Sequence, residues 1–300
     1  MKINKVLILG IDALEYDLVE EWDLKNLKQE EYGKSELPLL PNQEPTTVII
    51  WPCFITGKMP KEMGFSTIHV FPQPIQRMLE TVYPRIRKYL IDYKAKDITE
   101  KKKGKQSFLN KFAKWLNKMG LAHPPSKSDI ISDTIFDAIA NSLHLHIPVY
   151  DEDAFPPYRK RVVDAIENKA YRPIFEMQCM EEFKQRSREV FEWLERKNEW
   201  NLFMQYFFVL DGIQHVFYNQ TKKIAKFYIL FDEFVGKVRE KLDDDILLLI
   251  VSDHGQHKGI HTTHGFYSVN KPLGIRNPKL IDFRWIIEEI LKNGKKNRIK

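Results

Sequence analysis

The segment DILLLIVSDHGQHKGIHTTHGF, residues 245–266, joins an apolar run to a loop that is rich in histidine. Residues 245–252 are almost continuously apolar, which is typical of a parallel strand covered by helices on both faces. The segment therefore predicts a buried strand whose carboxyl end carries side chains of the kinds that bind metals. These side chains are Asp253, His254, His257, His261 and His264.

Three other segments have the composition of strands: residues 5–11, 143–150 and 201–210. Helical patterns lie between the strands and after the last one. Strands that alternate with helices are typical of an α/β fold. We therefore predict a mainly parallel central sheet flanked by helices. The expected helices cover residues 132–142, 174–197, 222–242 and 282–293.

Residues 70–128 interrupt this alternation. From Arg85 to Lys127 the chain has thirteen Lys and Arg residues against three acidic residues, a local balance of +10, whereas the whole chain has a net charge of +6. The basic character thus belongs to one segment, and we expect no nucleic-acid partner. We predict an α/β core formed by residues 1–69 and 129–300, with a basic helical cap inserted at 70–128.

Within this insertion, residues 106–119 have the apolar spacing of an amphipathic helix. Such a helix could lie on an anionic membrane surface. We favour a cap helix that packs on its own domain with its lysines in solvent.

Other sequence features concern location. The apolar runs are all shorter than the roughly 20 residues of a membrane-spanning helix, so we predict no transmembrane segment. The first apolar stretch ends at Asp12 without a small-residue cleavage site, so we interpret it as a buried strand rather than a signal peptide. Cys53 and Cys179 are too few for a disulfide framework, and a cytoplasmic location is expected.

Three aspartates follow predicted strands: Asp12, Asp211 and Asp253. Ligands of open α/β sheets bind beyond the carboxyl ends of the strands. Three carboxylates at this edge would repel one another unless a cation neutralised them. His215 lies one helical turn after Asp211, and His254 follows Asp253 directly. Because mixed nitrogen and oxygen ligands suit zinc or manganese, we predict two divalent ions, with Zn²⁺ favoured and Mn²⁺ as the alternative.

A nucleophile is available in the segment EPTTVII, residues 44–50, which contains Thr46 and Thr47. Coordination by a metal favours the alkoxide of a threonine hydroxyl. The residues alone do not choose between the two threonines. Local propensity predicts a strand here, because β-branched residues favour extended structure.

The order of these motifs resembles the alkaline phosphatase superfamily, and within it the type I phosphodiesterase/nucleotide pyrophosphatase branch. The resemblance covers roughly residues 4–70 and 130–270. It implies an alkaline phosphatase-like fold and places the nucleophile nine residues before Thr56, which selects Thr47 at the start of a helix. The motifs that carry it are Asp12, PTT (45–47), ITGKMPKEMG (55–64), DGIQH (211–215), SDHG (252–255) and THGF (263–266).

The resemblance also implies two sets of metal ligands and a covalent phosphoenzyme formed on Thr47. His257 and His261 match no ligand position of the branch. Ile68 stands where the branch has an asparagine that contacts the phosphoryl group, so the neighbouring His69 is a weak candidate for substrate binding. One ion would be held by Asp12, Asp253 and His254 together with Thr47, and the other by Asp211, His215 and His264.

The predicted function is thus a two-metal phosphoester hydrolase, a phosphodiesterase acting on a small phosphate ester such as a nucleotide. Two alternatives stay open. A phosphomonoesterase of the same superfamily would share these residues, because selectivity for the leaving group depends on the cap. A protein that retains the metals without catalysis would use them to bind a partner.

Overall fold

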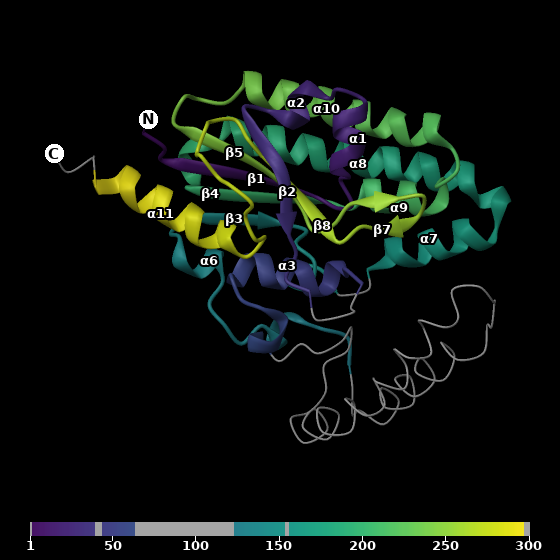
Figure 1. Cartoon of the computed structure of the whole chain (residues 1–300), viewed down its shortest axis with the longest axis horizontal. Coiled ribbons are helices and arrows are strands. Elements are labelled where there is room, and N and C mark those ends of the chain that lie inside the picture. The colour runs from purple at the N-terminus through teal and green to yellow at the C-terminus, as the bar shows by residue number, and fades with distance from the viewer. Residues whose placement is uncertain (1, 40–43, 64–122, 154–155, 297–300) are drawn as a thin grey trace.

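The computed structural model describes residues 2–39, 44–63, 123–153 and 156–296. They form an α/β structure in which helices cover both faces of one central sheet (Figure 1), and this confirms the predicted fold class. Most of the expected insertion lies outside the described residues, namely 70–122, including the amphipathic stretch 106–119. His69 lies outside them as well.

The central sheet has six strands in the order β2-β8-β5-β1-β4-β3. Strand β8 runs antiparallel to both of its neighbours, and the other pairs are parallel. A separate two-stranded hairpin, formed by β6 and β7, follows β5. The strands are β1 (Lys5–Ile11), β2 (Glu31–Glu36), β3 (Ser142–Leu145), β4 (Leu202–Phe207), β5 (Ile246–Ser252), β6 (Gln256–His257), β7 (Ile260–His261) and β8 (His264–Val269).

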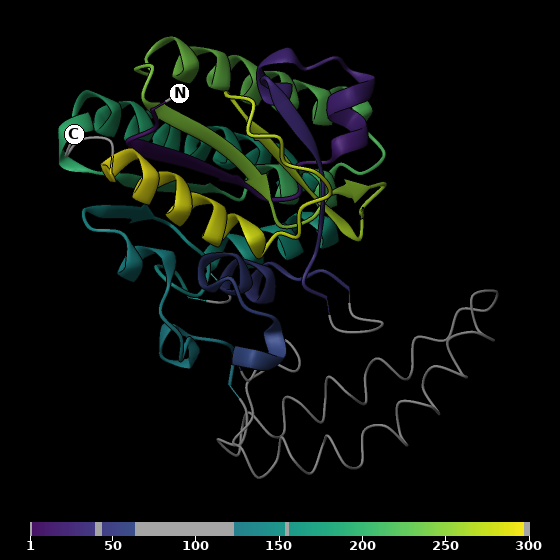
Figure 2. The same cartoon turned by 60° about the vertical axis from the view of Figure 1, so that its left-hand side comes forward.

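Two groups of helices enclose the sheet, as Figures 1 and 2 show from two directions. One face carries α3 (Thr47–Thr56), α6 (Ile135–Ala138) and α11 (Asp282–Lys296). The other face carries a larger group: α1 (Tyr16–Glu21), α2 (Lys25–Lys28), α7 (Pro157–Glu167), α8 (Arg172–Glu195), α9 (Val209–Val216) and α10 (Thr221–Glu240). Single 3₁₀ turns lie at Pro60–Met63, Lys127–Asp129, Lys169–Tyr171 and Lys197–Glu199.

Two of the predicted strands are shorter than expected. The strand predicted at 201–210 ends at Phe207, because Val209 already begins α9. The strand predicted at 143–150 ends at Leu145, because His146 and Val149 have φ angles of 65° and 70°, in the left-handed region that interrupts a strand. Strands β2 and β8, and the helices α1 and α7, were not predicted from the sequence.

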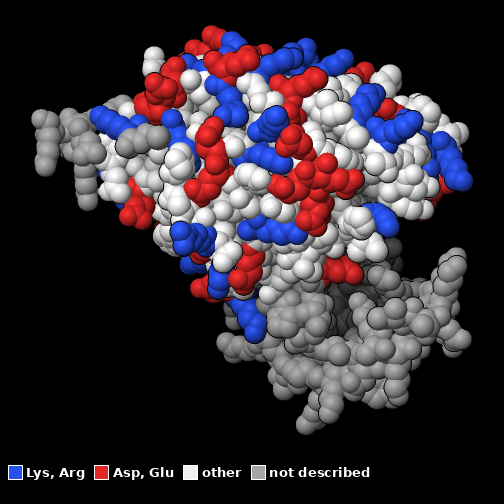
Figure 3. Space-filling view, turned by 45° about the horizontal axis from the view of Figure 1, so that its top comes forward, with Lys and Arg blue, Asp and Glu red and all other residues white. Residues whose placement is uncertain are grey.

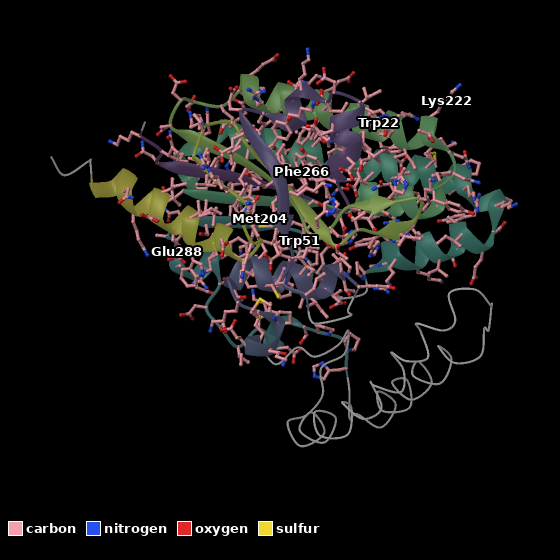
Figure 4. The ribbon with its side chains drawn as sticks, viewed as in Figure 1. Trp22, Trp51, Met204, Lys222, Phe266 and Glu288 are labelled. Carbon is pink, nitrogen blue, oxygen red and sulfur yellow. The ribbon has the colours of Figure 1, made fainter. Side chains whose placement is uncertain are left out.

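Helix α3 replaces the strand that local propensity predicts for TTVII, as the family resemblance required. Every residue from Val48 to Thr56 is buried, so burial outweighs the intrinsic preference of the β-branched side chains. Figure 4 shows Trp51 of α3 directed towards the sheet, close to Met204 of β4. A Cβ on Gly10 of β1 would lie only 2.7 Å from the Trp51 ring. A glycine is therefore needed for this close packing of α3 on β1.

The described surface mixes both signs of charge. On the face shown in Figure 3, basic and acidic side chains are interspersed over the described part of the molecule. Among the described helices, none is both long and apolar enough to cross a lipid bilayer.

Candidate active site

Three neighbouring strands bring the predicted aspartates together. Asp12 follows β1, Asp253 follows β5, and Asp211 lies in the first turn of α9 just after β4. Because β1 lies between β5 and β4, all three carboxylates reach the same edge of the sheet. Asp12 and Asp253 are buried, and Asp211 is partly exposed.

One group of potential ligands consists of Asp12, Asp253 and His254, whose ligand atoms all lie within 4.8 Å of one another. The Nε2 atom of His254 is 3.3 Å from Oδ1 of Asp12 and 3.5 Å from Oδ2 of Asp253. Within the described residues, these three atoms and Oδ1 of Asp253 are buried without a hydrogen-bond partner. Buried polar atoms without partners are costly, so this donor set fits a divalent cation, which would satisfy them.

The pKa values of the two aspartates in this group also favour a bound cation. Burial raises the pKa of Asp12 well above its ordinary value, and the charges of Asp253 and Asp211 raise it further. Burial also raises the pKa of Asp253 to about 7, with Asp211 adding to the effect. Carboxylates in such an environment resist ionisation on their own, and a bound cation reverses that preference.

A second group consists of Asp211, His215 and His261. The Nε2 atom of His215 lies 3.1 Å from Oδ1 of Asp211, and that of His261 lies 3.6 Å from the same oxygen. Burial raises the pKa of Asp211, but the two imidazoles outweigh it and the net shift is downward. Burial lowers the pKa of His261, but its contact with Asp211 prevails and raises the pKa to about 9.

The structure places His264 elsewhere. The family resemblance implied that this histidine joins Asp211 and His215, but its Nε2 atom lies 3.0 Å from Oε1 of Glu15. His264 is the first residue of β8, and Glu15 belongs to the loop after β1. The imidazole next to Asp211 and His215 is that of His261.

The hairpin of β6 and β7 brings His261, which the sequence left without a role, next to Asp211 and His215. Lys258 and Gly259 have φ angles of 50° and 80°, the left-handed values of a tight two-residue turn. This turn pairs Gln256 with His261 and so brings the histidine back to the sheet edge. The segment HKGIH contained the signal, because a glycine between two short strand-forming stretches indicates a hairpin.

Neighbouring groups orient the histidines. The side-chain nitrogen Nε2 of Gln256 donates to Nδ1 of His215 at 2.9 Å, and Nδ1 of His261 lies 3.1 Å from the carbonyl oxygen of Pro45. A histidine that donates its Nδ1–H to a carbonyl oxygen has its Nε2 free to bind a metal, so the contact with Pro45 orients His261 for ligation.

Thr47 lies beside the first group. It is the first residue of α3, and its hydroxyl donates a hydrogen bond of 3.3 Å to Oδ2 of Asp12. The same carboxylate oxygen accepts a hydrogen bond from the hydroxyl of Tyr206. In contrast, the Thr46 hydroxyl donates to the carbonyl oxygen of Glu44, on the exposed side. A helix amino terminus at this point also favours an anion, because its free N–H groups point towards it.

Comparison with protein families identifies the chain. The family model described as type I phosphodiesterase / nucleotide pyrophosphatase matches residues 6–275. The chain belongs to this family. The resemblance inferred from the motifs is thus confirmed, and membership supports a phosphoester hydrolase of a family that generally uses divalent metals.

This phosphodiesterase-family chain also resembles solved structures. A protein from Pyrococcus horikoshii, PH0037, is 11% identical with a TM-score of 0.47, and the alignment covers 97% of this chain and 98% of that one. Murine ectonucleotide pyrophosphatase/phosphodiesterase 5 is 13% identical with a TM-score of 0.41, over 84% of this chain and 57% of the other. Comparison of the sequence with curated proteins gives no match.

Proposed function

We propose that this member of the phosphodiesterase family is a two-metal hydrolase of small phosphate diesters, with Thr47 as its nucleophile. The observation that carries the proposal is the convergence of two ligand groups on one sheet edge, where Asp12 of the first group contacts the Thr47 hydroxyl. In a loop exposed to solvent, water would form hydrogen bonds with these carboxylate and imidazole atoms. Here they are buried and lack a partner among the described residues.

The ligand assignment follows from the distances. We propose that Asp12, Asp253 and His254 hold one ion together with Thr47, and that Asp211, His215 and His261 hold the other. His261 takes the position that the sequence assigned to His264, because its Nε2 atom lies 3.0 Å from that of His215. The mixed nitrogen and oxygen donors favour zinc, with manganese as the alternative. Two such ions, when bound, offset negative charge on the phosphate and on the attacking and leaving oxygens.

The chain itself supplies the nucleophile and its orientation. Oγ1 of Thr47 attacks phosphorus and loses its proton, the bond from phosphorus to the leaving alcohol breaks, and that alcohol departs protonated. The product is a phosphothreonine diester. Water then attacks the phosphorus, which releases a phosphate monoester and restores the Thr47 hydroxyl. Asp12 orients the attacking oxygen, and the first N–H groups of α3 stabilise the non-bridging oxygens.

The test compares two substrates and two threonine variants in the presence of Zn²⁺ or Mn²⁺. We expect the wild-type protein to hydrolyse bis-p-nitrophenyl phosphate faster than p-nitrophenyl phosphate. Thr47→Ala should lose diester turnover by roughly 10³-fold or more, because the nucleophile is removed. Thr46→Ala is the matched control and should retain it, because that hydroxyl points away from the carboxylates.

Each other outcome selects a different function. Turnover of the monoester alone would indicate the phosphomonoesterase of the same superfamily. Two bound ions with no turnover of either ester would indicate a binding protein. Full diester turnover by Thr47→Ala would exclude this residue as the nucleophile.

A further inference from the structure

A buried glutamate outside both ligand groups contacts the loop that carries His261. Glu15 is only 1% exposed, yet three donors satisfy its carboxylate. The Thr262 hydroxyl donates to Oε2 at 3.0 Å, and the Asp17 N–H donates to Oε1 at 3.1 Å. Nε2 of His264 lies 3.0 Å from Oε1. Two of these three partners therefore come from the segment that follows His261.

The backbone of this loop is shaped around the carboxylate. A Cβ on Gly255 would lie 2.1 Å from Oε2 of Glu15 and 2.5 Å from the Thr262 hydroxyl. The Gly255 N–H donates to the His264 carbonyl at 3.0 Å, and the Thr262 N–H donates to the Gly255 carbonyl at 2.9 Å. The loop thus closes on itself with the Glu15 carboxylate in contact with both of its ends.

Glu15 is also linked to the elements that carry Asp12 and His215. It lies three residues after Asp12 in the same loop. Its N–H donates a hydrogen bond of 2.9 Å to the Tyr228 hydroxyl, which lies 3.3 Å from the side-chain oxygen of Gln214, the neighbour of His215. One residue therefore connects the loop after β1, helix α9 and the histidine loop.

We infer that Glu15 is a positioning residue that fixes His261 beside Asp211 and His215, with His264 as its anchor rather than a ligand. The inference rests on the proposed two-metal function. The β6–β7 hairpin is short and partly exposed. The direction of the His261 side chain therefore depends on the contacts that hold the residues after the hairpin in place. A further metal site at Glu15, Asp17 and His264 does not follow, because both Glu15 oxygens already accept hydrogen bonds.

The experiment measures the binding of each zinc ion separately, by competition with a chromophoric chelator. Glu15→Gln keeps the size of the side chain but cannot accept all three hydrogen bonds. We expect the ion at Asp12, Asp253 and His254 to keep its affinity and the ion at Asp211, His215 and His261 to bind roughly 10- to 100-fold more weakly, as for other residues that orient a ligand. Glu21→Gln changes an exposed carboxylate at the end of α1 and should leave both affinities unchanged.

A double variant tests whether Glu15 acts through His261. If it does, adding Glu15→Gln to His261→Ala should weaken zinc binding no further, since the residue that it positions is already absent. Should Glu15→Gln fail to fold, Thr262→Val removes one of the three donors and should weaken the same ion selectively.

Different results would reject the role of Glu15 and the proposed two-metal function. A wild-type protein that binds fewer than two zinc ions would contradict the two-metal proposal itself. Two ions in the wild type with unchanged affinities in Glu15→Gln, or in Thr262→Val, would reject the role of Glu15 alone.

Discussion

The imidazole rings of His254 and His261 are stacked, with centroids 4.0 Å apart and planes inclined by 20°. Each ring belongs to a different group of potential ligands, so the two groups contact each other through these rings. Sites that bind two metals for phosphoryl chemistry hold them about 3.5–4 Å apart. We therefore expect the two proposed ions to lie close together in one site.

The first prediction concerns the number of ions. Crystals of the wild-type protein soaked in Zn²⁺ should show two anomalous peaks about 4 Å apart. His261→Ala should retain only the ion at Asp12, Asp253 and His254, and diester turnover should fall by roughly 10²-fold. His257→Ala is the control, because this histidine is in the same hairpin but exposed. Two peaks of equal height in His261→Ala would contradict the assignment.

The second prediction concerns Tyr206, whose buried hydroxyl donates to Asp12. Tyr206→Phe keeps the ring and removes this donor, so the carboxylate loses one of the groups that orient it. We expect the zinc ion at Asp12 to bind about 10- to 100-fold more weakly, measured by chelator competition, while the melting temperature of the metal-free protein changes little. Tyr171→Phe, which removes a hydroxyl bonded to Gln178 of α8, should have no effect on binding.

The third prediction concerns the packing of α3. Gly10→Ala places a methyl group 2.7 Å from the buried Trp51 ring and 3.3 Å from the end of Met204. We expect a loss of about 1–3 kcal/mol in the free energy of unfolding, as for other overpacked cores, measured by denaturant titration. Adding Trp51→Phe should recover part of this loss by making room. If Gly10→Ala is as stable as the wild type, the close contact described here does not limit the packing.

The fourth prediction concerns pH and His146. Its hydrogen bond with Glu152 raises the pKa of His146 despite burial and the nearby Arg186, and Glu189 contributes in the same direction. Because the folded-state pKa exceeds the unfolded value of about 6.5, the stabilisation is complete below pH 6.5 and disappears as the pH rises through the folded-state pKa.

His146→Asn tests this dependence, because asparagine tolerates the left-handed φ of 65° at this position. The wild type should exceed the variant in free energy of unfolding by more at pH 5.5 than at pH 8.5. An equal difference at both pH values would show that the charge of His146 does not contribute to stability.

Much of the central architecture was predictable from the sequence. Strand β1 has the predicted bounds and β5 begins one residue later than predicted, because strands buried on both faces are continuously apolar. The aspartates that follow them could be expected at one edge for the same reason. Strand β2 could not be predicted, because EYGKSE at the sheet edge is polar and pairs only with β8.

The choice among histidines also lay beyond the motif. His264 has the flanking residues of a ligand, THGF, but its position in space depends on the turn at Lys258 and Gly259 and on the contact with Glu15. The contact with Glu15 joins residues 249 positions apart in the chain, and a single sequence does not reveal such a contact. The helical start at Thr47 has a similar cause, since burial of the whole of α3 overrides its local preference.

The burial of α3 also has a consequence for the proposed nucleophile. Thr47 begins a helix whose remaining residues are all enclosed, so its backbone cannot shift without disturbing the packing around Trp51. If Thr47 is the nucleophile that we propose, a change of substrate preference is therefore expected from residues around it rather than from a shift of Thr47 itself.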